Sequence, residues 1–229
     1  LVVNKPAGLV VHPGAGNPDQ TLQNALLALD PRLSKQPRAG IVHRLDKQTP
    51  GLLTGARNDA ARPARTEAPS ARGIRREYQA VCVGVMTSGG TIDAPIDRHP
   101  VDRLRMTVRT SGRDAVTHYR VIERFRRHTW VRVMLETGRT HQIRLHLSHA
   151  GYPLVGDPVY GRRLVIPKGA TPKLEAALRA FRRQALHAAK LVFPHPVDGR
   201  EIEVTAPLPP DFVGLVAAVR KDAAAAQKK

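Results

Sequence analysis

Three segments in the middle of the chain carry the strongest strand signal. Residues 78–85, 115–122 and 130–135 are rich in β-branched and aromatic residues, and apolar residues alternate with polar ones at a period of two. Such alternation turns one face of a strand toward a core and the other toward solvent. The pattern predicts a mixed, mainly antiparallel sheet.

Helices are predicted to flank this sheet. One is capped by Thr21 and ends before Pro31, a second is capped by Thr140 and closed by Gly151, and a third covers about residues 172–186. Strands followed by helices of this length predict an α+β fold.

The length of 229 residues and the hydrophobic fraction of 41% are compatible with one domain that has a sizeable core. We predict a single domain over residues 1–229, with a low-complexity tail at residues 223–229 that frays. The chain begins without a methionine, so we expect that an upstream segment has been left out.

Residues 59–73 are the weakest part of the predicted fold. They offer only alanine for burial, and Pro63 fits a helix only in a first turn that begins near Asp59, whereas Pro69 would remove an interior hydrogen bond at a cost of about 3 kcal/mol. We predict a short first turn followed by a mobile connection.

The chain is strongly basic, with 37 Lys and Arg against 19 Asp and Glu and a net charge of +18. A charge of this size predicts a polyanionic partner. Nucleic acid is favoured over a membrane, because the basic residues are spread along the chain and form no basic amphipathic helix. Charge alone leaves a merely solubilising surface open.

Cys82 is the only cysteine, so a disulfide within the chain is excluded. The sequence has no apolar run long enough to span a membrane, and its start lacks the charged segment followed by an apolar segment that is typical of a signal peptide. We therefore predict a cytoplasmic protein without a membrane partner.

Asp46 stands alone in a basic segment, residues 41–47, with the sequence IVHRLDK. A single carboxylate beside cations suits a nucleophile or a base that its neighbours keep ionised, acting on a polyanion. Asp46 lies between the apolar pairs at residues 41–42 and 52–53, so it is expected in a loop that leads from one strand toward another.

Two further strings make the pattern specific, TGRTHQIR at residues 137–144 and PLVGDPVYG at residues 153–161. In register with HRLD, they resemble the RluA-type RNA pseudouridine synthases, closest to the ribosomal large subunit pseudouridine synthase D branch. The resemblance extends over nearly all of the chain.

The resemblance implies the pseudouridine synthase catalytic fold, with a central RNA-binding cleft. It also implies isomerisation of uridine to pseudouridine without metal, nucleotide or redox cofactor. The implied partner is large-subunit (23S) ribosomal RNA, modified at the helix 69 stem-loop by a monomer. The small RNA-binding domain that usually precedes the catalytic domain in this branch is absent from the chain.

The same resemblance implies a role for each of several residues. Asp46 is implied as the essential carboxylate, acting either as a nucleophile at C1′ or as a base at C2′, and the sequence does not choose between them. Arg144 is implied as its cation, Tyr78 as the tyrosine that stacks on the uracil, and Arg44 as the residue that fills the place of the flipped base.

Further RNA contacts are predicted from His43, Lys47, Arg139 and His141. A metal site at His141, His146 and His149 is disfavoured, because no Cys or acid partner accompanies their spacing. Taken singly, Arg44 would be a surface ion-pair residue and Tyr78 a packing residue. An RNA-binding module without turnover and a nuclease remain the rival functions.

Overall fold

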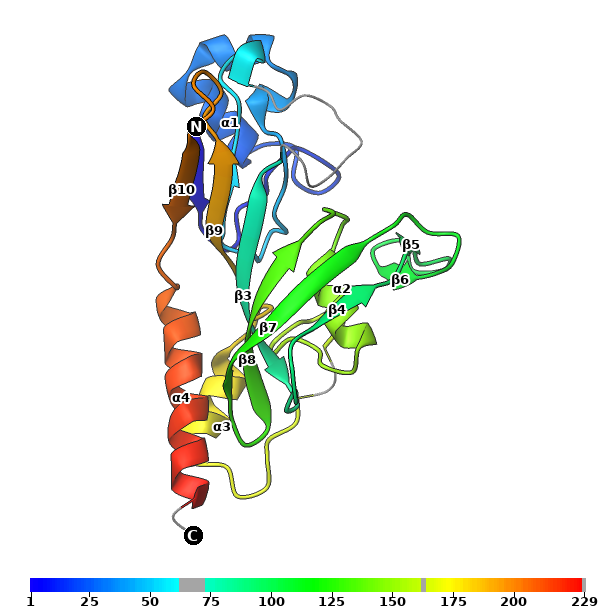
Figure 1. The fold of residues 1–229 in the computed structure, drawn as a ribbon, viewed down its shortest axis with the longest axis vertical. Coiled ribbons are helices and arrows are strands. Elements are labelled where there is room, and N and C mark those ends of the chain that lie inside the picture. The colour runs from blue at the N-terminus through cyan, green and yellow to red at the C-terminus, as the bar shows by residue number, and fades with distance from the viewer. Residues whose placement is uncertain (62–72, 162–163, 228–229) are drawn as a thin grey trace. The chain divides into compact units, whose positions relative to one another are not determined.

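The computed structural model describes residues 1–61, 73–161 and 164–227 (Figure 1). Its residues divide into two compact units, Leu1–Arg76 with Ala188–Pro207, and Glu77–His187 with Leu208–Lys229. Strands supply the framework of both units, and helices pack beside them, as the predicted α+β class requires.

The first unit holds the N-terminal elements and two returning strands. In chain order they are β1 (Val2–Lys5), α1 (Leu22–Leu29), the 3-10 turns η1 (Pro31–Lys35), η2 (Pro37–Gly40) and η3 (Asp59–Ala61), β2 (Gly51–Thr54), most of β9 (Leu186–Pro194) and β10 (Glu201–Thr205). The predicted cap of α1 is confirmed, because the Thr21 side chain accepts from the Asn24 backbone N–H and the Asn24 side chain accepts from that of Thr21.

The strands of the first unit lie in the order β1-β2-β9-β10. β1 pairs antiparallel with β2, β2 meets β9 in parallel at Gly51 and Ala188, and β9 pairs antiparallel with β10. Gly51 has φ +118°, and a Cβ there would lie 2.2 Å from the Ala188 carbonyl oxygen. Only glycine permits this close approach, which fixes where the Asp46 loop enters the sheet.

The second unit contains a four-stranded antiparallel sheet and a separate hairpin. It includes β3 (Arg75–Val83), of which the first two residues belong to the first unit. Its other elements are β4 (Gly90–Asp93), β5 (Ile96–Arg98), β6 (Met106–Val108), β7 (Val116–Arg124), β8 (His128–Leu135), α2 (Gln142–His149), α3 (Pro172–Ala180) and α4 (Pro210–Gln227). The sheet order is β3-β8-β7-β4, and β5 forms a hairpin with β6. β3, β7 and β8 confirm the three predicted strands.

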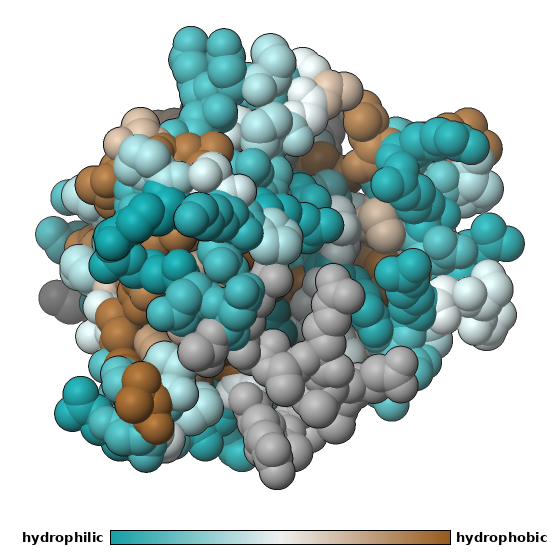
Figure 2. Space-filling view, turned by 90° about the horizontal axis from the view of Figure 1, so that it is seen from above, coloured by the Kyte–Doolittle hydropathy of each residue, from teal (hydrophilic) through white to brown (hydrophobic). Residues whose placement is uncertain are grey.

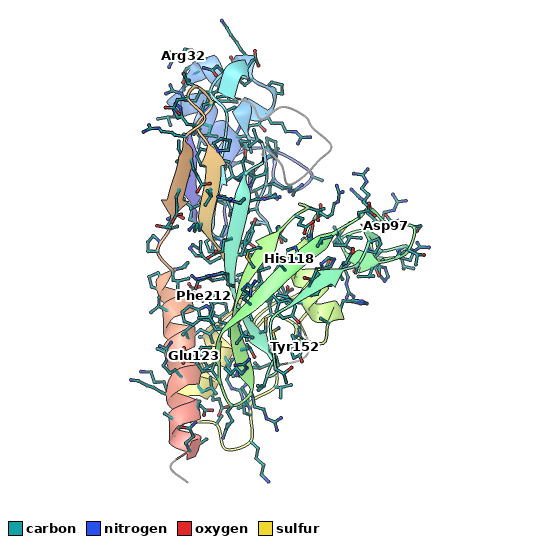
Figure 3. The ribbon with its side chains drawn as sticks, viewed as in Figure 1. Arg32, Asp97, His118, Glu123, Tyr152 and Phe212 are labelled. Carbon is teal, nitrogen blue, oxygen red and sulfur yellow. The ribbon has the colours of Figure 1, made fainter. Side chains whose placement is uncertain are left out.

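Helices α3 and α4 pack together over one core cluster of the second unit (Figure 1). Phe212 of α4, labelled in Figure 3, is fully buried there beside Leu174 and Leu178 of α3. Arg220 of α4 also pairs with Glu123 of β7, which attaches the helix to the sheet.

Two predicted helix boundaries and the predicted frayed tail differ from the structure. α2 does not start at a Thr140 cap, because His141 takes the N-cap position in a left-handed conformation. α3 ends at Ala180, because Phe181 turns to extended backbone and β9 begins at Leu186. The predicted frayed tail is helical to Gln227, since Asp222 and Ala223 pack against the second unit and alanine favours helix.

The predicted short first turn of the 59–73 segment agrees with η3, a single 3-10 turn. Residues 62–72, including Pro63 and Pro69, lie outside the described residues, so the rest of that prediction stays untested. None of the described helices is both long and apolar enough to cross a bilayer.

Candidate active site

The loop at residues 42–50 of the first unit places Asp46 between a buried anchor and two exposed cations. Leu45 is 5% exposed and fixes the loop to the unit, whereas Asp46 is half-buried and Arg44 and Lys47 are exposed. The carbonyl oxygen of Asp46 accepts a hydrogen bond of 3.0 Å from the Thr49 backbone N–H, which closes a turn. The carboxylate therefore sits on a defined turn beside the surface.

The Lys5 side chain anchors this loop to β1. Its side chain is fully buried, and its ammonium donates to the carbonyl oxygens of Pro6, Leu9 and Lys47 at 2.9, 2.9 and 3.0 Å. The Lys47 carbonyl also accepts from the Gly8 backbone N–H at 2.8 Å. A buried ammonium requires this degree of satisfaction, so Lys5 ties β1 and its turn to the residue next to Asp46.

His43 helps to fix the orientation of the loop. Its Nε2 accepts a hydrogen bond of 3.1 Å from the Thr54 backbone N–H of β2. Burial, and then the charge of Arg76, lower the pKa of His43 to about 3. The imidazole is therefore neutral and tied to β2, and the RNA contact predicted for His43 stays a prediction.

Arg44 belongs to a positively charged region of the first unit. Burial lowers the pKa of His12, the hydrogen bond that its Nδ1 donates to Gln23 Oε1 opposes this, and the charges of Arg38 and Arg44 lower it further. Arg38 is exposed and has φ +55°, a conformation that side chains other than glycine rarely adopt. Hydrophilic side chains cover much of the face seen from above in Figure 2.

In the second unit, Arg144 of α2 forms a buried bidentate pair with Asp157. Arg144 Nε donates to Asp157 Oδ2 at 2.8 Å and Nη2 to Oδ1 at 2.9 Å, with side-chain exposures of 5% and 0%. Burial raises the pKa of Asp157, but Arg144 and the backbone N–H groups of Tyr160 and Val159 outweigh it and hold that pKa below its ordinary value. The pair stays ionised and fixes the guanidinium plane.

Tyr160 connects this pair to the start of α2 and to the β5–β6 hairpin. Its hydroxyl accepts from the Met106 backbone N–H at 2.7 Å and lies 2.9 Å from His141 Nδ1. The Arg144 guanidinium carbon lies 5.2 Å from the centre of the tyrosine ring, and that of Arg105 lies 5.7 Å away. Both distances fall within the range of a cation–π contact.

The remaining residues near α2 are held by a polar network. Arg139 Nε donates to the Asp114 carbonyl oxygen at 3.0 Å, and the Arg139 backbone N–H donates to Gln142 Oε1 at 2.9 Å. His146 is fully buried against Thr117 Oγ1 and the Ala94 carbonyl oxygen, both at 2.9 Å. His146 is therefore a packing histidine.

Tyr78 lies on β3, opposite Val133 of β8, and is 5% exposed. Its strand position is as predicted, and its role against uracil stays a prediction. The pairing of Arg144 with Asp46 also stays a prediction. Among the described residues, no group of three or more His, Cys, Asp or Glu side chains is arranged to hold a metal ion.

Sequence reasoning missed Lys5, Asp157 and Tyr160. Lys5 follows an apolar run and precedes Pro6, but a lysine is rarely fully buried, so its residue type pointed to the surface. Asp157 and Tyr160 stand inside the PLVGDPVYG string that supported the resemblance, and that string was the one available signal for them.

Comparisons with known proteins identify the family of the chain. Residues 1–149 match the family described as RNA pseudouridylate synthase. Ribosomal large subunit pseudouridine synthase D of Xanthomonas campestris pv. campestris is 61% identical over 226 residues, covering 99% of this chain and 68% of that protein. The protein of the same name from Escherichia coli K12 is 54% identical over 222 residues, covering 97% and 68%.

Two solved human structures resemble the fold. RNA Pseudouridylate Synthase Domain Containing 4 gives a TM-score of 0.72 at 28% identity, covering 96% of this chain and 89% of that one. RNA Pseudouridylate Synthase Domain Containing 1 gives 0.66 at 29% identity, covering 91% and 80%. Sequence and fold agree, and the chain therefore belongs to the RNA pseudouridylate synthase family of isomerases.

Proposed function

We propose that this enzyme converts uridine to pseudouridine in large-subunit ribosomal RNA, at the helix 69 stem-loop, with Asp46 as its catalytic carboxylate. The observation that carries the proposal is the Asp46 loop, a single carboxylate held on a defined turn by Lys5 and flanked by exposed cations. The relatives named for ribosomal large subunit RNA, which align with nearly the whole chain, support this substrate class.

The reaction is an isomerisation in which atoms are conserved. The bond from uracil N1 to C1′ of the ribose breaks, the base turns, a bond forms from C5 to C1′, and the C5 proton is lost while N1 gains one. Asp46 serves either as a nucleophile at C1′ or as a base that removes the C2′ proton. Both routes require an ionised carboxylate with an exposed oxygen, and the half-buried Asp46 offers the position for it.

Arg144 is proposed as the cation that balances Asp46 when the uridine is bound. An arginine left to rotate would supply this charge poorly, because its long side chain has many rotamers. The bidentate pair with Asp157 removes that freedom and sets the guanidinium plane before substrate arrives. Tyr78 is proposed to stack on the uracil.

We assign RNA binding to the net charge of +18 and in particular to Arg44, Lys47 and Arg139. Arg44 and Lys47 extend from the Asp46 loop into solvent, and Arg139 precedes α2. Arg44 is proposed to occupy the place of the flipped uridine, where a planar guanidinium can stack on bases. We further propose that the enzyme acts in the cytoplasm as a monomer.

The test is to incubate the purified chain with a 23S ribosomal RNA transcript and to map pseudouridines by carbodiimide labelling and primer extension. New pseudouridines in the helix 69 loop, in strands of unchanged length, are expected. Binding without new pseudouridine would favour an RNA-binding module, shortened strands would favour a nuclease, and pseudouridines elsewhere would refute only the assigned site.

A further inference from the structure

His12 is a half-buried histidine of the first unit that the proposed reaction does not use. Its Nδ1 lies 3.1 Å from Gln23 Oε1 of α1, and because an amide oxygen only accepts, Nδ1 carries the hydrogen and donates it. The other nitrogen, Nε2, makes no hydrogen bond among the described residues, and it is not one of their unpaired polar atoms that are cut off from solvent. His12 is therefore fixed through one nitrogen and presents the other to solvent.

Arg38 stands on a rigid turn close to this histidine. η2, which contains Arg38, packs against α1, whose Gln23 holds His12. The turn is fixed, because the Ile41 backbone N–H donates to the Arg38 carbonyl oxygen at 3.1 Å and the Ile41 side chain is buried. The Arg38 guanidinium itself is exposed and makes no hydrogen bond or ion pair among the described residues. The turn thus holds an unpaired cation in a defined place.

The charges that act on His12 are positive. α1 contributes the neutral Gln23, η2 contributes Arg38, and the Asp46 loop contributes Arg44, while no carboxylate of the described residues acts on the imidazole. Burial first, and then these two guanidiniums, lower the pKa of His12, so the ring is neutral when the site is empty. Two exposed cations beside an imidazole, with no acid to balance them, attract an anion.

We propose that Arg38 and His12 bind one phosphate of the RNA backbone beside the Asp46 loop, and that His12 takes up a proton when the phosphate binds. The inference rests on the proposed function, because the ligand is a phosphate of that RNA substrate. The Arg38 guanidinium donates to the phosphate oxygens. The negative charge favours protonation of the imidazole, so a proton from solvent adds to Nε2, which donates to the same phosphate while Nδ1 keeps its bond to Gln23.

This linkage predicts how RNA affinity depends on pH. The pKa of His12 lies below its ordinary value in the free enzyme and rises when the phosphate binds. Between these two values RNA binding takes up one proton, so affinity falls by up to roughly tenfold for each unit that the pH rises. Above the pKa of the bound state, His12 is neutral with and without RNA, and its contribution to the pH dependence ends.

Titration of a labelled helix 69 stem-loop between about pH 6 and pH 8 tests the linkage. His12→Asn places an amide N–H near the Nδ1 position, so the bond to Gln23 can be kept, but it removes the nitrogen that gains the proton. This variant should lose most of the pH dependence of the wild type. His195→Asn is the matched control, because His195 also belongs to the first unit but its Nδ1 is paired with Asp198 at 2.9 Å. It should keep the wild-type pH dependence.

Arg38→Asn tests the other half of the site. It removes the charge, and asparagine suits the left-handed φ of +55° better than arginine does, so the turn is kept. RNA affinity should fall by roughly threefold to tenfold, with a salt slope smaller by about 0.7, and the pH dependence should shrink as well. Arg32→Gln is the control, since it removes the same charge from an exposed arginine that is paired with Asp30 (Figure 3).

Nitrogen NMR of His12 in the wild type gives a reading that needs no substitution. Its pKa should rise when the stem-loop is added. A pKa that stays unchanged or falls, or a His12→Asn variant with the full pH dependence of the wild type, would overturn the inference. An active wild type whose His12 does not respond to RNA refutes this inference alone, whereas proton uptake on binding without any pseudouridine formed refutes the proposed function alone.

Discussion

Lys5→Met removes the buried ammonium and keeps most of the side-chain volume. The carbonyl oxygens of Pro6 and Leu9 would lose this donor, while the Lys47 carbonyl would keep its bond from the Gly8 backbone N–H. Pro6 is exposed and Leu9 is half-buried, so the loss of the two hydrogen bonds, at about 0.5–1.5 kcal/mol each, predicts a loss of roughly 1–3 kcal/mol. Against a total stability of about 5–15 kcal/mol, this is a large fraction.

Urea unfolding of wild type and Lys5→Met measures this loss directly. The matched control is Lys47→Met, because Lys47 is exposed and its ammonium contacts only the Asn17 side chain, at 3.3 Å, among the hydrogen bonds described. That variant should stay within about 0.5 kcal/mol of wild type. Pseudouridine formation should fall in Lys5→Met, because the turn that carries Asp46 loosens. Equal stability of the two variants would refute the assigned role of Lys5.

Three further changes test other parts of the structure. Asp157→Asn should cost about 1–3 kcal/mol in unfolding free energy, because the two bonds from Arg144 lose their ionised acceptor; a loss under about 0.5 kcal/mol would contradict this. Burial lowers the pKa of His43 to about 3 and that of His128 to about 4. The stability that these two histidines contribute is therefore full above the unfolded value near 6.5 and falls as the pH drops, by roughly 3 kcal/mol per pH unit near pH 5, since at these two positions the unfolded chain binds about two more protons. His43→Gln should remove about half of that slope, and an unchanged slope would show that His43 is not the titrating group. Arg44→Ala should reduce turnover and base flipping while changing the salt dependence of RNA binding by less than about 0.7, the value for one phosphate contact; unimpaired flipping of a fluorescent base would exclude the stacking role.

Local signals in the sequence predicted local structure well. Thr21 and the residue three positions later form the cap of α1, and the segments with strand-like composition form β3, β7 and β8, because these features depend on neighbours in the chain. The start of α2 was misplaced at Thr140, since the left-handed His141 is stabilised by Tyr160, nineteen residues away. Helix-capping rules use only residues close together in the sequence, so they could not predict that contact.

The same limit explains which site residues were found. Asp46 and Arg144 were found because each lies in a recognisable string. Asp157 was missed because its effect on Arg144 arises from folding a loop back onto α2, across thirteen residues. Lys5 was missed because its three carbonyl partners come from a turn and a distant loop, and only their convergence makes the burial of a lysine favourable.

The most direct test of the central claim is pseudouridine formation by Asp46→Asn. The amide keeps the size of the carboxylate and removes the charge that either route requires. On a helix 69 substrate we predict no detectable pseudouridine, with RNA affinity and the urea unfolding midpoint close to those of wild type. A rate within tenfold of wild type would contradict the assignment of Asp46 as the catalytic carboxylate.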